Sequence, residues 1–165
     1  MRRRIVIWLA LFLACLALQA TVAARVALWG VRPDLVFLAL FVFALRSGPL
    51  PGIYVGFVLG LCQDLYAPAV LGQNALCKTV TGYFCGLFNE RMMRTDPVVK
   101  LVILLLAFLL HDLMFWGVDV LKQGAPPVSL LVNLGIRTLP RAAYTMVFAA
   151  LYYGVERLRA PSADA

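Results

Sequence analysis

Several charged side chains of this sequence lie in or at the ends of long apolar segments, where a charge is costly. Asp64 ends one such segment, Lys78 lies near the start of the next, and Asp112 lies within a third. A charged side chain at the centre of a bilayer costs at least about 2.5–3.5 kcal/mol on insertion scales, so pairing with an opposite charge is the expected remedy. Two chemistries fit these residues: structural ion pairs between helices, or catalysis by buried carboxylates.

The first predicted pair joins Asp64 to Lys78. Each lies in line with glycines spaced four residues apart, a pattern that places them on one helix face and lets a second backbone approach closely. In an antiparallel hairpin Asp64 and Lys78 would lie at the same depth, with Gln63 and Asn74 as polar neighbours. The alternative is that both charges reach the lipid headgroups independently. The glycines, which we interpret as helix-packing or partner-interface residues, are Gly52, Gly56, Gly60, Gly82 and Gly86.

A second set of charges predicts another helix interface. Asp112 and Asp119 are seven residues apart and Arg137 and Arg141 are four apart, so each pair shares a helix face. We predict that these acidic and basic residues are partners between two helices. We interpret His111 as a packed or interfacial histidine, not as a proton relay.

Other uses of these residues are less well supported by the sequence. An intramembrane aspartyl dyad of Asp64 and Asp112 is one alternative, but Asp64 lacks the second glycine immediately before it that presenilin-type proteases carry. No Asn-rich segment resembles those of the lipoprotein signal peptidases. A small-molecule capture subunit of a transporter is another alternative, because charges at depth and helices broken by Gly or Pro mark many transport sites. With one histidine and four scattered cysteines, we expect free thiols and neither a metal nor a cofactor.

The composition identifies the environment in which these residues lie. Hydrophobic residues form 63% of the 165-residue chain, charged residues form 14%, and the mean hydropathy is +0.90. Soluble domains have roughly 45–50% and about 25% respectively, and disordered chains have still fewer apolar residues. The net charge of +7 comes mostly from residues between apolar segments, not from a solvated face of the kind that binds nucleic acid. We therefore predict a membrane protein.

The apolar segments predict an all-α integral membrane bundle of about six transmembrane helices in a single domain, residues 1–165. The second span is short, with only eleven purely apolar residues at 35–45, and Pro140 should kink or break the last. Nine basic residues lie on the side of the termini and three on the other, which indicates that both termini are cytoplasmic. The expected spans are 5–24, 33–46, 51–66, 75–89, 98–118 and 128–155.

Three motifs together resemble one known family. RPDL at 32–35, GLCQDL at 60–65 and LCKTVTGY at 76–83 are similar, in order and spacing, to motifs of the rod shape-determining protein MreD family. The later Leu139-Pro140, the length and the number of spans agree as well. The resemblance covers almost the whole chain.

The resemblance implies a non-enzymatic scaffold in the bacterial inner membrane that helps organise lateral peptidoglycan synthesis and rod shape. It implies direct binding to the transmembrane helix of MreC, and indirect association with MreB, RodZ, RodA and a class B penicillin-binding protein. It also implies a helix arrangement similar to that of the substrate-capture subunits of energy-coupling-factor transporters. A homo-oligomer within the complex stays open. The basic segment 91–100 is expected to contact anionic lipid headgroups or a cytoplasmic partner.

Overall fold

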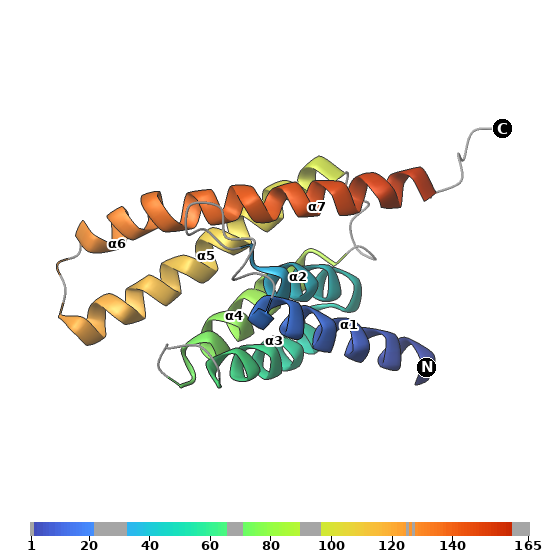
Figure 1. Ribbon diagram of the computed structural model, residues 1–165, viewed down its shortest axis with the longest axis horizontal. Helices are drawn as coiled ribbons and strands as arrows, with labels where there is room; N and C mark the ends of the chain where they lie inside the picture. The colour runs from blue at the N-terminus through green and yellow to red at the C-terminus, as the bar shows by residue number, and fades with distance from the viewer. Residues whose placement is uncertain are drawn as a thin grey trace.

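Helices joined by short connections make up the fold in this computed structural model (Figure 1). The structure describes residues 2–21, 33–65, 71–89, 97–124, 126 and 128–159, and within them there is no strand. The predicted all-helical class is therefore confirmed for this part of the chain. The helices are α1 (Arg2–Thr21), α2 (Leu35–Ser47), α3 (Pro49–Asp64), α4 (Gln73–Leu87), α5 (Pro97–Gln123), α6 (Val128–Asn133), the π-helix η1 (Leu134–Thr138) and α7 (Leu139–Arg159).

The hairpin of α3 and α4 brings two backbones into direct contact. A Cβ added to Gly52 would overlap the carbonyl oxygen of Gly82, and one added to Gly56 would overlap that of Lys78. Gly60 lies equally close to the start of α4. In lipid the hydrophobic effect does not drive helices together. Close packing of small residues is therefore a principal source of helix association in a membrane.

Helix α2 lies at the centre of the bundle, which explains how so short an apolar segment is accommodated. It contacts α1, α3, α4 and α7, and its Phe37 and Phe41 join a buried cluster with Leu104 and Phe108 of α5. A segment this short can thin the bilayer, recruit preceding residues, or be shielded by neighbouring helices. Helix α2 is shielded by its neighbours.

Helix α5 pairs with the long final helix, which is made of α6, η1 and α7 in succession. The far end of α5 and α6 lie beyond the ends of the other helices, at the left of Figure 1. Pro140 was expected to kink or break this last segment. The helix is not broken there, since it continues from α6 to α7, and a π-helical turn precedes the proline. A π-turn is one of the local adjustments by which a helix absorbs an irregular hydrogen-bonding position.

With α6, η1 and α7 taken as one continuous helix, the described helices follow the order of the predicted segments, with shifted ends, and their crossing of a membrane stays a prediction. Helix α5 continues to Gln123, past the predicted end at 118, and α7 continues to Arg159, past 155. Of the described helices, α5 is long and apolar enough by itself to cross a bilayer, whereas Ile5–Thr21 and Leu35–Ser47 are apolar but shorter. Residues 22–24, 66 and 91–96, which belong to predicted spans or to the basic segment, lie outside the described residues.

Candidate functional site

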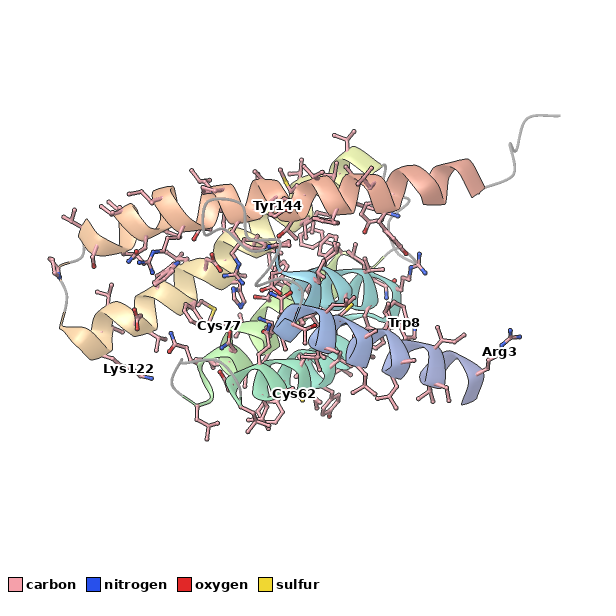
Figure 2. The ribbon with its side chains drawn as sticks, viewed as in Figure 1. Arg3, Trp8, Cys62, Cys77, Lys122 and Tyr144 are labelled. Atoms are coloured by element: carbon pink, nitrogen blue, oxygen red, sulfur yellow. The ribbon has the colours of Figure 1, made fainter. Side chains whose placement is uncertain are left out.

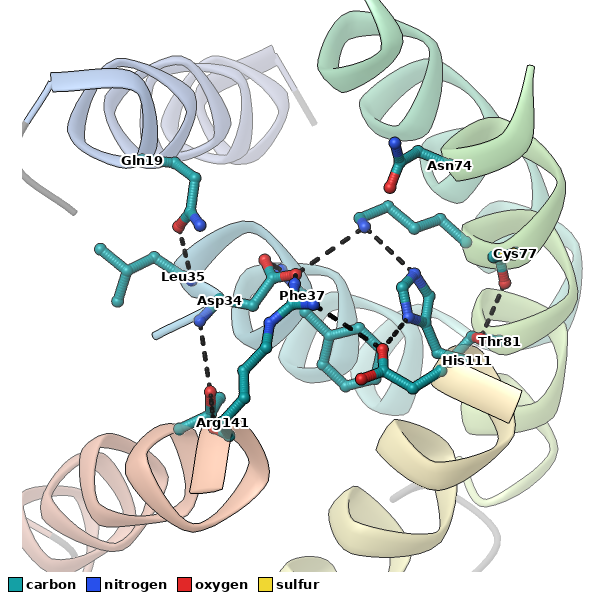
Figure 3. A network of polar contacts seen from close by, with 12 residues as sticks. Gln19, Asp34, Leu35, Phe37, Asn74, Cys77, Thr81, His111 and Arg141 are labelled. Carbon is teal, nitrogen blue, oxygen red and sulfur yellow. Dashed lines mark hydrogen bonds and ion pairs between the residues drawn. The ribbon is translucent and has the colours of Figure 1, made fainter. Parts of the chain in front are cut away.

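A ring of five ionisable side chains lies where α2, α4, α5 and α7 meet (Figure 3). Asp34 Oδ2 accepts a hydrogen bond from Arg141 Nη2 at 2.5 Å and lies 3.9 Å from Lys78 Nζ. Lys78 Nζ lies 3.3 Å from His111 Nε2, and His111 Nδ1 lies 2.8 Å from Asp112 Oδ1. Asp112 Oδ1 is in turn 3.8 Å from Arg141 Nη1, which closes what we call the charge ring.

The donors and acceptors of the charge ring indicate how its protons are placed. Lys78 can only donate, so His111 Nε2 must accept, and the proton of a neutral imidazole then lies on Nδ1, facing Asp112. A second proton on Nε2 would point at the Lys78 ammonium. Two carboxylates, two cations and a neutral histidine leave the charge ring without net charge. This is the least costly composition for a cluster whose members, apart from Arg141, are almost completely buried.

Two threonines of the last helix support the charge ring. Thr138 Oγ1 donates to Asp112 Oδ2 at 2.7 Å, and Thr145 Oγ1 accepts from the backbone N–H of Asp34 at 3.2 Å. Thr138 is the final residue of the π-turn, a helix irregularity that is frequent at functional positions. Both threonines are fully buried, so each supplies a hydrogen bond where water cannot.

The start of α2 is built around Asp34. Its Oδ1 accepts from the backbone N–H of Phe37 at 2.8 Å, which is the N-cap interaction expected of an aspartate before a helix. Gln19 of α1 bridges the same turn: its Oε1 accepts from Leu35 N–H at 2.9 Å, and its Nε2 donates to the Pro33 carbonyl at 3.0 Å. The carboxylate thus caps a helix with one oxygen and joins the charge ring with the other.

Asp64 does not pair with Lys78, and that prediction is wrong. Asp64 Oδ1 accepts from the backbone N–H and the side-chain Nδ2 of Asn74 at 3.0 and 2.9 Å. Oδ2 accepts from the N–H groups of Gly72 and Ala75 at 2.9 and 3.1 Å. The carboxylate binds the N-terminus of α4, where free N–H groups and the helix dipole favour a negative charge. Lys78 lies one turn further along α4 and belongs to the charge ring.

The second predicted interface is present between α5 and the last helix, with a change of partner. Asp112 lies beside Arg141, as given above, but Arg137 does not pair with Asp119. Its guanidinium lies over the ring of Trp116, 5.2 Å from the ring centre. The two helices run antiparallel. Trp116 lies one turn after Asp112 on α5, and Arg137 lies one turn before Arg141 on the last helix, so these two residues meet. Asp119 lies almost one further turn along α5.

The remaining predicted residues have structural positions. The five glycines lie in the α3–α4 hairpin, where Gly86 faces Pro49. The glycine-bearing faces of both helices are therefore packed against each other. Gln63 is buried beside Asp64, and its Oε1 has no hydrogen-bond partner within the described residues. Asp64 and Asp112 bind different groups and share no hydrogen bond, so they do not form the dyad of an aspartyl protease.

Comparison with known proteins identifies the family. The family model of rod shape-determining protein MreD matches residues 2–158, which is nearly the whole chain. The chain belongs to the MreD family. No curated protein and no solved structure matches it. The MreD family is a bacterial membrane protein family with a role in determining rod shape, and it is a structural family not known for enzymatic activity.

Within this MreD-family chain, the centre of the charge ring was not predicted from the sequence. Asp34 was noted only as part of the RPDL motif. A usable signal existed, because an aspartate after a proline and directly before an apolar segment is a typical N-cap. Thr138, Thr145 and Gln19 carry no comparable signal, since single polar residues in apolar helices commonly have no such role.

Proposed function

We propose that this chain is a multi-pass scaffold of the bacterial inner membrane, with both termini in the cytoplasm, that binds the transmembrane helix of MreC and helps organise lateral peptidoglycan synthesis. One observation carries the proposal. The buried acidic and basic side chains of the described residues, Asp34, Asp64, Lys78, His111 and Asp112, each have a partner within the protein.

That pairing supports a structural role over a chemical one. A catalytic group or a transport site needs a polar atom that a substrate can reach, and such groups are exceptions among buried side chains. The members of the charge ring bind one another, and the Asp64 carboxylate accepts hydrogen bonds from the N-terminus of α4. What the molecule offers to other molecules is therefore its apolar outer surface.

The surface we assign to the partner helix lies on α6 and η1. Val128 and Leu131 are 65% and 69% exposed, and Gly135 follows them at helical spacing with no atom within 4 Å of the position of an added Cβ. Gly56 and the other glycines of α3 and α4 are, by contrast, covered. An apolar face with an accessible glycine lets a second helix approach closely in lipid.

The location of this face also suits a partner that crosses the membrane. The far end of α5 and α6 extend beyond the other helices in Figure 1, and η1 directly follows α6 in the chain. We propose that MreC binds along this extension, and that MreB, RodZ, RodA and the class B penicillin-binding protein associate indirectly, through MreC. The bundle of six spans that this requires consists of α1 to α5 and the final α6–η1–α7 helix.

Leucine substitutions at three glycines test the proposal by co-purification of MreC from membranes. Gly135→Leu should reduce recovered MreC while keeping the protein folded, because leucine is a better helix former than glycine and the site is open. Gly154→Leu, at an equally open glycine of α7, is the matched control and should recover MreC normally. Gly56→Leu should reduce the yield of folded protein itself.

Two results would contradict the proposal. If Gly135→Leu and Gly154→Leu both keep MreC at the wild-type ratio, the partner surface lies elsewhere. If the purified protein turns over a defined compound, the scaffold role is wrong. The mass of the wild-type complex, taken together with the ratio of the two proteins in it, also measures whether this chain forms a homo-oligomer there.

A further inference from the structure

An open groove runs between α1 and α3 on the outside of the bundle, with α2 at its base. Its volume is about 1020 Å³, and its walls are mainly apolar side chains such as Phe12, Phe43 and Val58. Figure 2 labels two of its residues, Trp8 on α1 and Cys62 on α3. We call it the α1–α3 groove.

The groove is polar at one end only. Arg46 and Ser47, at the end of α2, line it together with Tyr54 and Tyr152, and Arg46 Nη2 donates to the Tyr152 hydroxyl at 3.0 Å. Trp8, in the first half of α1, lies at the same end. Arginine with tyrosine and tryptophan is the combination found where a membrane protein meets the headgroups, since these side chains have an apolar body and a polar tip.

The length of the groove matches one leaflet of a bilayer. Along α1 its lining extends from Ile5 to Leu16, eleven residues on, or about 16 Å at the rise of 1.5 Å per residue. The hydrocarbon core of a bilayer is about 30 Å thick, so one leaflet contributes about 15 Å. An acyl chain of a lipid lies within one leaflet, so the groove has the length that a single lipid needs.

We propose that the α1–α3 groove binds an anionic phospholipid of the leaflet next to the N-terminus, with an acyl chain along the apolar walls and the phosphate at Arg46. The inference rests on the membrane insertion of α1 to α3 that the proposed function requires. A guanidinium can bind phosphate through two parallel hydrogen bonds, which supplies the charge complementarity at the polar end.

Two matched pairs of variants test this binding. Val58→Trp fills the groove, and Val102→Trp places the same side chain on an exposed position of α5 that does not line it. Arg46→Gln removes the charge at the polar end, and Arg3→Gln removes an exposed charge from the first turn of α1 that is outside the lining. Each protein is reconstituted in vesicles of phosphatidylglycerol and phosphatidylethanolamine, and retained lipid is counted by native mass spectrometry.

The wild-type protein should retain phosphatidylglycerol in preference to phosphatidylethanolamine. Val58→Trp should abolish this retention, and Arg46→Gln should weaken it about fivefold, the effect of one basic residue worth about 1 kcal/mol near an anionic lipid. Val102→Trp and Arg3→Gln should behave as wild type. Added glycerol phosphate should not compete, since it lacks the acyl chain.

Equal retention by Val58→Trp and Val102→Trp would overturn the inference, as would an unchanged affinity in Arg46→Gln. Loss of bound lipid to glycerol phosphate would show that the groove recognises the phosphate alone and does not need the acyl chain. A photo-crosslinker at position 58 that captures another protein in place of lipid would assign the groove to a partner helix. Resistance of the protein to carbonate extraction separates the two proposals, because an extractable protein contradicts the proposed function and an integral protein without retained lipid contradicts only this inference.

Discussion

The charge ring predicts that Asp34 and Lys78 stabilise the fold as a unit. Lys78→Met keeps much of the length of a fully buried side chain and removes the ammonium, which leaves the charge ring with one net negative charge. Asp34→Asn removes the carboxylate charge, while the remaining oxygen can still accept from Phe37 N–H, so the N-cap of α2 is kept. The two variants therefore perturb charge balance with little change in shape.

The size of the effect follows from the geometry. At the observed 3.9 Å the Asp34–Lys78 attraction is about 4 kcal/mol for an effective dielectric constant of about 20. Removal of one member of a buried pair typically costs about 3–5 kcal/mol, because the other charge is left uncompensated. We expect each single variant to lose free energy of unfolding in that range. The double variant restores neutrality and should be less destabilised than the sum of the singles by about 2 kcal/mol.

The assay is unfolding by SDS in mixed micelles, followed by tryptophan fluorescence of the chain's three tryptophans. Lys122→Met, at an exposed lysine near the end of α5, is the matched control and should change stability by less than about 0.5 kcal/mol. Additive losses in the double variant would show that the two groups do not act together. Single-variant losses as small as that of Lys122→Met would refute the reasoning that the charge ring holds the helices.

Three further predictions concern helix packing, the N-terminus of α4 and the charge ring, and each is checked by thermal melting in detergent. Gly56→Ala should destabilise the protein by about 1–3 kcal/mol because the added Cβ overlaps the backbone of α4. Gly117→Ala, in open space, should stabilise the protein by up to about 1 kcal/mol. A change of stability with the same sign in both variants would contradict the packing. Asp64→Ala should cost about 2 kcal/mol because the N-terminus of α4 loses its acceptor, and an unchanged melting temperature would contradict that role. Thr138→Val removes the donor to Asp112 Oδ2 and should cost about 1–3 kcal/mol, whereas Thr138→Ser should keep most of the stability.

Local patterns accounted for much of the fold. Apolar length and breakers predicted the helices in their observed order, with ends that differ by a few residues, because helix formation in an apolar chain depends on neighbours along the sequence. The glycine pattern predicted close helix contact for the same reason, since spacing alone decides which residues share a face. The sequence could not say whether those faces met each other or a partner.

The pairing of the charges was decided by the tertiary structure. The sequence established that each charge in an apolar segment needs a partner, but the partners it suggested came from adjacent helices. Asp34 and Arg141, which are 107 residues apart, are brought together by the placement of α2 against α7. Asp64 accepts hydrogen bonds from the N–H groups at the start of α4, which have no partner within the helix. Lys78 therefore lies with Asp34 and His111. Residue spacing sets the face on which a charge lies, whereas the order and axial offset of packed helices decide which charge it meets.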